Sequence, residues 1–241
     1  MNLIPDHTSR ESALTAPVAK SKANSSDRAY EQLRRQVLNG ELQPGAHFLV
    51  QQLADMLKIS RTPLREALIR LEEDGLVEVV PRHGIRISQL SIPDMDEIYM
   101  ILIGLEPIAA ALVAERGCSE AEMGTLISST QEMEERLEKG DIENWALADA
   151  LFHLTIVRAR GNKRLGDIIL KCWDQVTRAR MFTLRVRGPY QPRQSAIEHR
   201  QVIEAIQNKD PERAAEVFRT HRTRGGREQI EILRELGISQ F

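Results

Sequence analysis

Three histidines and one aspartate in the C-terminal half of the chain have the residue types of a metal site. Asp149 precedes His153 by four positions, so on a helix the carboxylate and the imidazole share one face. That face also carries Ala146, which indicates that it points inward, and His199 and His221 fall on two further predicted helices. A buried carboxylate beside buried imidazoles is costly unless something offsets its desolvation. A divalent cation does so, and imidazole with one carboxylate suits zinc, nickel, iron or manganese.

The long spacing between these residues leaves the chemistry open. The same pattern is compatible with core histidines satisfied by protein groups, or with a hydrogen-bonded Asp149–His153 pair. Open positions at a metal would also suit a hydrolase. Against an enzyme, the sequence has no H-E-x-x-H, Gly-x-Ser-x-Gly, Walker-type or Gly-x-Gly-x-x-Gly motif. A metal-dependent enzyme or a metal sensor is therefore the alternative to an effector site.

A second group of residues suited to chemistry is Ser60–Leu68, which predicts a helix that reads duplex DNA. Ser60 is a good N-cap, and Pro63 falls in the first turn, where a missing N–H costs little. Arg61 and Arg65 are four positions apart and share a face, and their planar guanidiniums suit guanine edges and phosphates. A separate apolar stripe consists of Leu64, Ala67, Leu68 and Leu71. The alternative is that both arginines are merely solvated.

The flanking residues predict the remainder of a winged helix-turn-helix. Upstream, a short amphipathic helix around Leu53 is followed by the sharp turn Lys58–Ile59, and Gly75 ends the recognition helix downstream. Two β-branched runs, Leu76–Val80 and Ile85–Ile87, then predict a hairpin.

The predicted hairpin carries cationic side chains at and beside its tip. Its turn is Pro81–Gly84, which includes Arg82 and His83, and Arg86 follows on the second strand. We expect this wing to lie along a DNA groove beside the recognition helix.

Composition sets the outer limits. The chain has 241 residues, of which 41% are hydrophobic and only 4% aromatic, so it can fill one large or two modest cores, as in helical bundles. Its net charge is −2, so affinity for DNA must come from a local patch rather than from global charge.

Several features favour a cytoplasmic protein. Cys118 and Cys172 lie far apart and form no C-x-x-C, which fits inert core or helix-end residues in a reduced compartment. We expect no membrane-spanning helix, because no apolar run in the sequence is taken to approach the length that a bilayer requires. Residues 1–26 lack the apolar segment of a secretory signal and predict a disordered tail.

From Leu90 onward the sequence predicts helices alone, arranged as an antiparallel bundle with short loops. Ser91 and Ser119 begin capping boxes, Asp210 caps the last helix, and Pro107 should kink or interrupt the first one. The first helix is expected to bury Ile98, Ile101, Leu102, Leu105, Ile108 and Leu112. The first helix is expected to end at about 116, and the second to run from 119 past 137. The four helices that follow are expected at about 140–161, 163–187, 193–208 and 211–236.

The predicted fold class is mainly α. An N-terminal winged helix-turn-helix with a small β-hairpin wing precedes an all-α antiparallel helical bundle. We expect the tail at 1–26, the DNA-binding domain at 27–89, a linker at 90–93, and an effector-binding and dimerisation domain at 94–236.

The N-terminal pattern resembles the winged helix-turn-helix of the GntR family of bacterial transcription regulators. The resemblance covers Tyr30–Ser88 and is carried by Leu33–Gly40, Leu42–Gly45, Ser60–Leu68 and the Gly75–Leu76 break.

That resemblance implies roles for individual residues. The family's residues matching Arg61 and Arg65 contact bases, the position of Thr62 contacts the DNA backbone, and the wing tip matching His83–Gly84 enters the minor groove. Some members place a base-reading arginine where Gln51 stands, which is a departure here. The implied DNA surface comprises Ser60, Arg61, Thr62, Arg65, Gln51, Arg82, His83 and Gly84.

From about Met95 to Leu233 the chain resembles the FadR-type C-terminal effector domain. The matching residues are Asp149-x-x-x-His153, Gly161–Asn162, Glu198-His199-Arg200, and Ala214–Ala215 leading into His221. Many members of that domain bind a metal at the positions of Asp149, His153, His199 and His221. The resemblance therefore implies a divalent metal, zinc or nickel first, at these four residues.

The same resemblance bears on the effector. Members that bind organic acids often carry an arginine where Leu102 stands, so a carboxylate would need Arg178, Arg180 or the metal, and both arginines are expected on the solvated surface. Glu106 is expected on the inward face, either beside a ligating histidine or in a polar cluster.

These patterns predict a sequence-specific transcription regulator, a repressor in preference to an activator. We expect a homodimer that binds a palindromic operator in double-stranded DNA. A small-molecule effector, an organic acid, would bind the helical domain over the metal.

Overall fold

The computed structural model describes residues 24–159, 161–187 and 192–241. They form two compact units, one ending at Leu90 and including Phe241, the other spanning Ser91–Gln240. Phe241 joins the first unit through two backbone hydrogen bonds with Leu90, of 2.9 and 3.0 Å. The predicted tail lies almost wholly outside the described residues.

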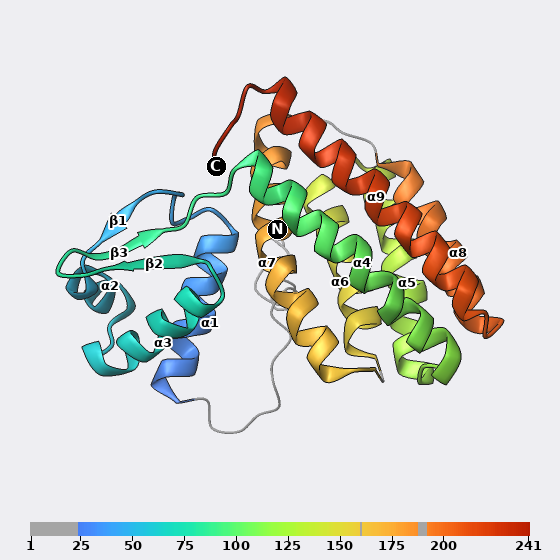
Figure 1. The fold of residues 1–241 in the computed structure, drawn as a ribbon, viewed down its shortest axis with the longest axis horizontal. Coiled ribbons are helices and arrows are strands. Elements are labelled where there is room, and N and C mark those ends of the chain that lie inside the picture. The colour runs from blue at the N-terminus through green and yellow to red at the C-terminus, as the bar shows by residue number, and fades with distance from the viewer. Residues whose placement is uncertain (1–23, 160, 188–191) are drawn as a thin grey trace, which may run out of the picture. The chain divides into compact units, whose positions relative to one another are not determined.

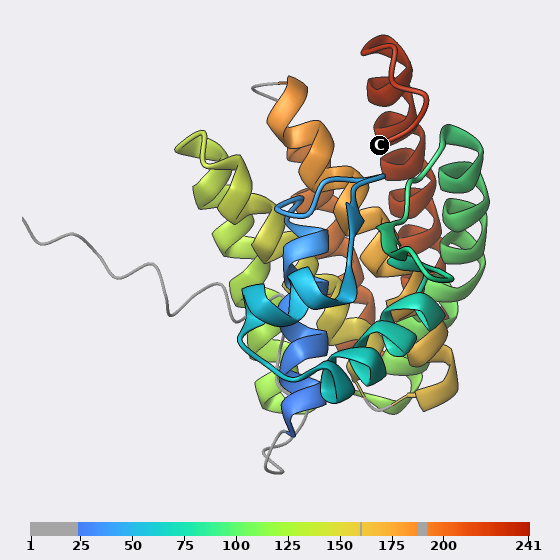
Figure 2. The same ribbon diagram turned by 90° about the vertical axis from the view of Figure 1, so that its left-hand side faces the viewer.

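The first unit is a winged helix-turn-helix (Figure 2). Its elements are α1 (Ser25–Leu38), β1 (His47–Phe48), α2 (Val50–Leu57), α3 (Arg61–Glu73), β2 (Val77–Val80) and β3 (Gly84–Ile87). Leu53, Leu64 and Leu71 are completely buried at its centre, as the helical spacing predicts. The apolar stripe of α3 therefore anchors the helix and leaves its other face free.

The wing is a three-stranded antiparallel sheet in the order β1-β3-β2. The hairpin of β2 and β3 was expected, whereas β1 was not; His47 and Phe48 pair with Arg86 and Ile85. Gly84 opens β3 with φ +93°, and a Cβ there would lie 2.1 Å from the carbonyl oxygen of Phe48. Only glycine fits at this point of the wing.

The sharp turn before α3 forms as predicted, but the predicted cap does not. Lys58 adopts the left-handed conformation at the end of α2 and turns the chain within two residues. Ser60 occupies the N-cap position of α3 without a side-chain cap hydrogen bond, so that expectation is wrong. Its hydroxyl stays exposed at the start of the recognition helix.

The second unit is a helical bundle (Figure 1). Its helices are α4 (Ile92–Arg116), α5 (Glu120–Glu138), α6 (Ile142–Arg158), α7 (Lys163–Arg187), α8 (Arg193–Gln207) and α9 (Pro211–Glu235). The predicted caps at Ser91, Ser119 and Asp210 are confirmed, each accepting a backbone hydrogen bond. The predicted stop of α7 at Gly188–Pro189 lies outside the described residues.

Helix α4 departs from three expectations. It continues through Pro107 without interruption. Ile101 and Ile108, expected inside, are 44% and 48% exposed. The helix is also long and apolar enough, by length and composition alone, to cross a membrane, so the statement that no apolar run approaches a span is wrong. Half of its most apolar stretch is buried inside the structure, as in a core helix.

Helices α4 and α9 lie side by side along much of their length (Figure 1). At Gly226 of α9 the two helices approach closely, and a Cβ there would lie 2.8 Å from ring atoms of Tyr99 on α4. A larger residue at this position would force the helices apart.

Candidate metal centre and nucleic-acid interface

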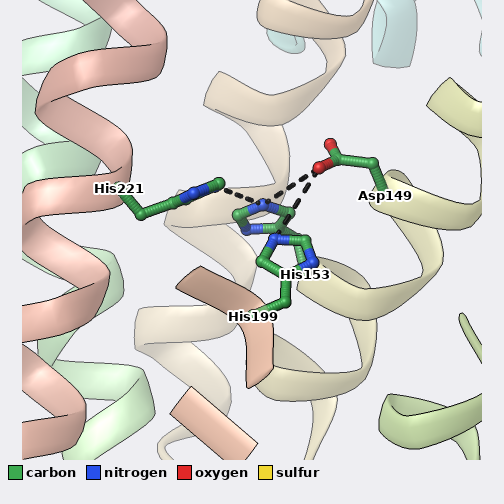
Figure 3. A group of neighbouring side chains, drawn as sticks. All are labelled: Asp149, His153, His199 and His221. Carbon is green, nitrogen blue, oxygen red and sulfur yellow. Dashed lines mark hydrogen bonds and ion pairs between the residues drawn. The ribbon is translucent and has the colours of Figure 1, made fainter. Parts of the chain in front are cut away.

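Four predicted ligands from three helices converge in the bundle (Figure 3). Asp149 and His153 come from α6, His199 from α8 and His221 from α9. One donor atom from each lies within 4.8 Å of the others, and all four residues are buried. The structure therefore brings together residues separated by up to 72 positions in the sequence.

The donor atoms point at one another rather than at protein partners. His221 Nε2 lies 3.1 Å from His153 Nε2, and Asp149 Oδ1 lies 3.7 Å from His199 Nε2. Within the described part of the chain, Asp149 Oδ1 and both ring nitrogens of His199 have no hydrogen-bond partner. Buried polar atoms left unpaired are costly, and a cation held between these donors would satisfy them. The donor set of three imidazoles and one carboxylate fits a divalent metal.

The electrostatic surroundings keep two of the histidines in the form that binds metal. Burial lowers the pKa of His153 well below its usual 6.5, and the cation of Arg222 lowers it further. Burial likewise lowers the pKa of His199, with His221 adding to the effect and Asp149 opposing it. Both imidazoles are therefore neutral at physiological pH, as a ligand must be. The ring of His199 is also held by stacking on Phe152, with centroids 3.7 Å apart.

An arginine that the sequence analysis placed on the surface belongs to the site. Arg180 of α7 donates a hydrogen bond to Asp149 Oδ2, and its side chain is only 18% exposed. Burial alone would raise the pKa of Asp149, but Arg180 and the neighbouring histidines hold it at about 2. Arg178 is buried as well, which lowers its pKa to about 10. The expectation that both arginines are solvated is wrong.

Glu106 lies in a buried polar cluster behind His153. Arg222 of α9 forms a bidentate ion pair with Glu106, and Trp173 Nε1 donates to Glu106 Oε1 at 2.5 Å. Arg222 Nη2 lies 3.0 Å from His153 Nδ1, and Glu106 Oε1 lies 3.9 Å from the same nitrogen. Glu106 thus belongs to a polar cluster and also lies beside the predicted ligand His153. These are the two roles that the sequence left open.

His221 is oriented by a second carboxylate. Its Nδ1 lies 2.7 Å from Glu198 Oε2, so the Nδ1–H donates there and Nε2 faces the other donors. Arg224 also donates to Glu198. Burial would raise the pKa of Glu198, but the hydrogen bonds from His221 and Arg224 lower it to about 2. A carboxylate that fixes the ring of a histidine in this way is typical of metal sites.

Three members of this site were not identified from the sequence, and a fourth, Arg180, was named as a possible effector partner but placed on the surface. Trp173 and Arg222 contact Glu106, which lies far from both in the sequence, so no short-range signal identifies these contacts. Glu198 directly precedes a predicted ligand and was quoted only as part of the matched motif.

The predicted base-reading residues lie on the exposed face of α3. Arg61, Thr62 and Arg65 are all exposed. Arg61 Nε donates a 2.5 Å hydrogen bond to Gln51 Oε1, and Gln51 in turn donates to Asp55 at 2.6 Å. Gln51 therefore holds the Arg61 guanidinium at the surface.

At the wing, the structure separates two kinds of cation. Arg82 and His83 are exposed at the tip, where Arg82 has φ +68°. Arg86 instead forms an ion pair with Glu78 on the neighbouring strand. This ion pair does not support the expectation that Arg86 faces a DNA groove together with Arg82 and His83.

The family comparisons agree with both halves of this description. The model described as "FCD domain" matches residues 97–224, and the model described as "Bacterial regulatory proteins, gntR family" matches residues 25–87. The chain therefore belongs to the GntR family and carries an FCD effector domain, as the resemblances implied. It is a DNA-binding transcription regulator and not an enzyme.

Individual relatives carry similar descriptions. "Uncharacterized HTH-type transcriptional regulator YdhC" of Bacillus subtilis is 31% identical and covers 80% of this chain and 85% of its own length. A "Probable D-xylose utilization operon transcriptional repressor" of Paenarthrobacter nicotinovorans is 33% identical, covering 77% and 80%. The solved structure of Escherichia coli McbR/YncC shares the fold with a TM-score of 0.74, at 24% identity over 86% of this chain and 97% of that chain.

Proposed function

We propose that this protein is a cytoplasmic repressor whose helical unit binds a divalent metal, zinc or nickel, and a small organic acid. Two copies would bind a palindromic operator as a homodimer, with the recognition helices in successive major grooves. The acid would change the affinity for DNA by favouring one arrangement of the dimer, which needs only about 1–3 kcal/mol of coupling.

The convergence of the four buried donors is the observation that carries the metal proposal. Asp149, His153, His199 and His221 would hold the ion, which would supply a Lewis-acidic position for a carboxylate oxygen. Glu198 would keep Nε2 of His221 directed at it. Arg180, bound to Asp149, is a cation beside this position that an anionic effector could use in place of the arginine missing at Leu102.

The DNA proposal rests on the exposed face of α3. Arg61 and Arg65 would read guanine edges in the major groove, while Thr62 and Ser60 would contact the DNA backbone. Gln51 would position Arg61, as its hydrogen bond indicates. In the wing, Arg82, His83 and Gly84 would reach the minor groove.

Elemental analysis of the purified full chain tests the metal site. We expect close to one equivalent of zinc or nickel in the wild-type protein and loss of the metal in His199→Ala and His221→Ala. His47→Ala is a matched control, because this histidine lies in the DNA-binding unit and should not alter metal content. Full metal content in His199→Ala would remove the site as proposed.

A thermal-shift screen of small organic acids, with and without chelator, tests the effector. We expect an acid to raise the melting temperature of the metal-loaded protein and to lose most of this effect after chelation. If metal alone changes operator affinity and no acid adds to it, the protein is a metal sensor, and the organic-acid proposal fails.

A further inference from the structure

The two ring nitrogens of His153 face different partners. Its Nε2 lies 3.1 Å from Nε2 of His221 and faces the other predicted ligands (Figure 3). Its Nδ1 lies 3.0 Å from Nη2 of Arg222. A guanidinium has only donors and keeps its protons in proteins. Nδ1 of His153 therefore accepts this hydrogen bond and carries no proton.

This contact fixes the tautomers of two histidines. A neutral imidazole without a proton on Nδ1 carries it on Nε2, so Nε2–H of His153 donates to Nε2 of His221. The latter nitrogen is free to accept, because Nδ1–H of His221 donates to Glu198 at 2.7 Å. A continuous chain of hydrogen bonds thus runs from Arg222 through both rings to Glu198.

The two histidines differ in their readiness to bind a metal. A ligating histidine offers a bare nitrogen to the ion, and its other nitrogen carries a proton that it donates to a carboxylate, carbonyl or water. His221 already has this form, with Nε2 bare and Nδ1–H on Glu198. His153 has the opposite form, because its proton is on the nitrogen that faces the site.

We infer that His153 exchanges its tautomer when the metal site is filled, and that Glu106 replaces Arg222 as the partner of its Nδ1. This inference rests on the proposed metal site and adds the rearrangement that filling it requires of the protein. His153 releases the proton of Nε2 to water and takes one up from water at Nδ1. The ring stays neutral throughout, and no net proton is exchanged.

Glu106 is the acceptor that the new Nδ1–H needs. Its Oε1 lies 3.9 Å from Nδ1 of His153, a short movement from hydrogen-bond distance. In the metal-free protein this oxygen accepts from Trp173 Nε1 at 2.5 Å and from Arg222 Nη2 at 2.7 Å. Two lone pairs do not hold three donors, so Nη2 of Arg222, which also loses its acceptor on His153, turns away. Nε of Arg222 keeps its hydrogen bond to Oε2, so the charge of Glu106 stays compensated.

The exchange connects the occupancy of the site to contacts between helices. Arg222 lies on α9, Glu106 on α4 and Trp173 on α7. The hydrogen bonds among these three side chains therefore differ between the metal-free and the metal-loaded protein.

Nuclear magnetic resonance of the full chain labelled with 15N-histidine tests the exchange, because 15N chemical shifts separate protonated from bare ring nitrogens. We expect the proton of His153 on Nε2 in chelator-treated protein and on Nδ1 after saturation with zinc. His221 is an internal control, since its proton should stay on Nδ1 in both states. The variants His153→Asn and His221→Asn assign the two sets of signals.

The outcomes separate this inference from the proposed metal site. If His153 keeps its proton on Nε2 in zinc-saturated protein, the ion is held without this ring and the inference is overturned. A proton on Nδ1 before zinc is added also overturns it, because Arg222 then does not set the tautomer. A purified protein that retains no zinc in elemental analysis removes the proposed site itself, and the inference with it.

Two arginines of α9 allow a matched test by substitution. Arg222→Lys keeps a cation for Glu106 but replaces the fork of donors that reaches both Glu106 and His153 by a single ammonium. Losing the charge-assisted hydrogen bond to Nδ1 removes the contact that holds His153 in the metal-incompatible tautomer. Zinc should therefore bind ~10-fold more tightly. Arg224→Lys is the control, because Arg224 donates to Glu198 rather than to a histidine, and it should not tighten zinc binding.

Competition with a chelator of known zinc affinity measures both variants, and circular dichroism shows whether each is folded. A folded Arg222→Lys protein with wild-type zinc affinity would contradict the role of Arg222 in setting the tautomer. The histidine spectra use the wild-type chain, so they decide the inference even where Arg222→Lys does not fold.

Discussion

The two units of this molecule place their functional groups in opposite environments. The DNA-binding unit carries Arg61 and Arg65 on an exposed helix face, held up by a small core. The helical unit carries Asp149 and His153 in its interior, where every polar atom needs a partner. A surface site depends on few other residues, whereas a buried site depends on all its neighbours.

The ion pairs show the same contrast. Arg86 and Glu78 in the wing are 43% and 51% exposed, while Arg222 and Glu106 in the bundle are 2% and 0% exposed. An exposed pair contributes little to stability, but removing one partner of a buried pair leaves a charge without compensation.

Removing one carboxylate from each pair should therefore have very different effects. Glu106→Ala should lower the free energy of unfolding by about 3–5 kcal/mol, and Glu78→Ala by about 1 kcal/mol or less. Both tryptophans, Trp145 and Trp173, lie in the helical unit, so fluorescence during urea unfolding reports Glu106→Ala, and circular dichroism reports Glu78→Ala. Equal losses of unfolding free energy in the two variants would contradict the contrast between the buried and the exposed ion pair.

Acid should destabilise the metal-free helical unit. His153 and His199 have pKa values lowered well below 6.5 in the folded protein. Below about pH 6.5 these histidines are protonated in the unfolded chain but remain neutral in the folded unit. The free energy of unfolding therefore falls as the pH decreases towards the pKa values of the folded state.

The pH effect is measurable by urea unfolding of chelator-treated protein between about pH 7.5 and 5. In this range Asp149 and Glu198 do not interfere, because their folded pKa values are about 2. His153→Asn should show a shallower pH dependence than the wild-type protein. An unchanged slope in this variant would contradict the assignment.

Changing a surface reader should leave the rest of the protein intact. Arg61→Ala should cost about 1–3 kcal/mol of discrimination between operator and unrelated duplex, with unchanged metal content and unfolding free energy. Fluorescence anisotropy at fixed salt measures the discrimination. Gln51→Ala should give a smaller loss, because it removes only the support of Arg61. Normal discrimination by Arg61→Ala would mean that the reading surface lies elsewhere.

Alanine substitutions at two glycines should have small effects on stability, with opposite signs. Gly124 lies in the second turn of α5, and a Cβ there would meet nothing within 4 Å, so Gly124→Ala should raise stability by up to about 1 kcal/mol. Gly84→Ala should instead lower the thermal stability of the wing, because its Cβ would collide with the Phe48 carbonyl. Circular dichroism melting of both variants measures the opposite signs.

The sequence predicted those parts of the fold that local chemistry determines. Ser91, Ser119 and Asp210 mark helix starts because a side chain caps the helix within three residues of itself. The hairpin followed from β-branched runs on either side of a turn. The two-residue strand β1 was missed because His47 and Phe48 become a strand only by pairing with β3.

The candidate site was predicted less completely. The four predicted ligands do converge, but their surroundings depend on contacts that sequence spacing does not encode. Arg222 and Glu106 are 116 positions apart and meet because α4 lies beside α9. Ile101 and Ile108 were misplaced for a related reason, because periodicity cannot select the buried side of a helix that is apolar all round.

The close approach of α4 and α9 at Gly226 restricts how relatives of this protein can vary. A methyl group at position 226 would overlap the ring of Tyr99, so these two sites cannot change independently. Among relatives with the same helix packing, we expect an alanine or serine in place of Gly226 to occur together with a smaller residue in place of Tyr99. A larger residue at position 226 of α9 thus requires a smaller one at position 99 of α4.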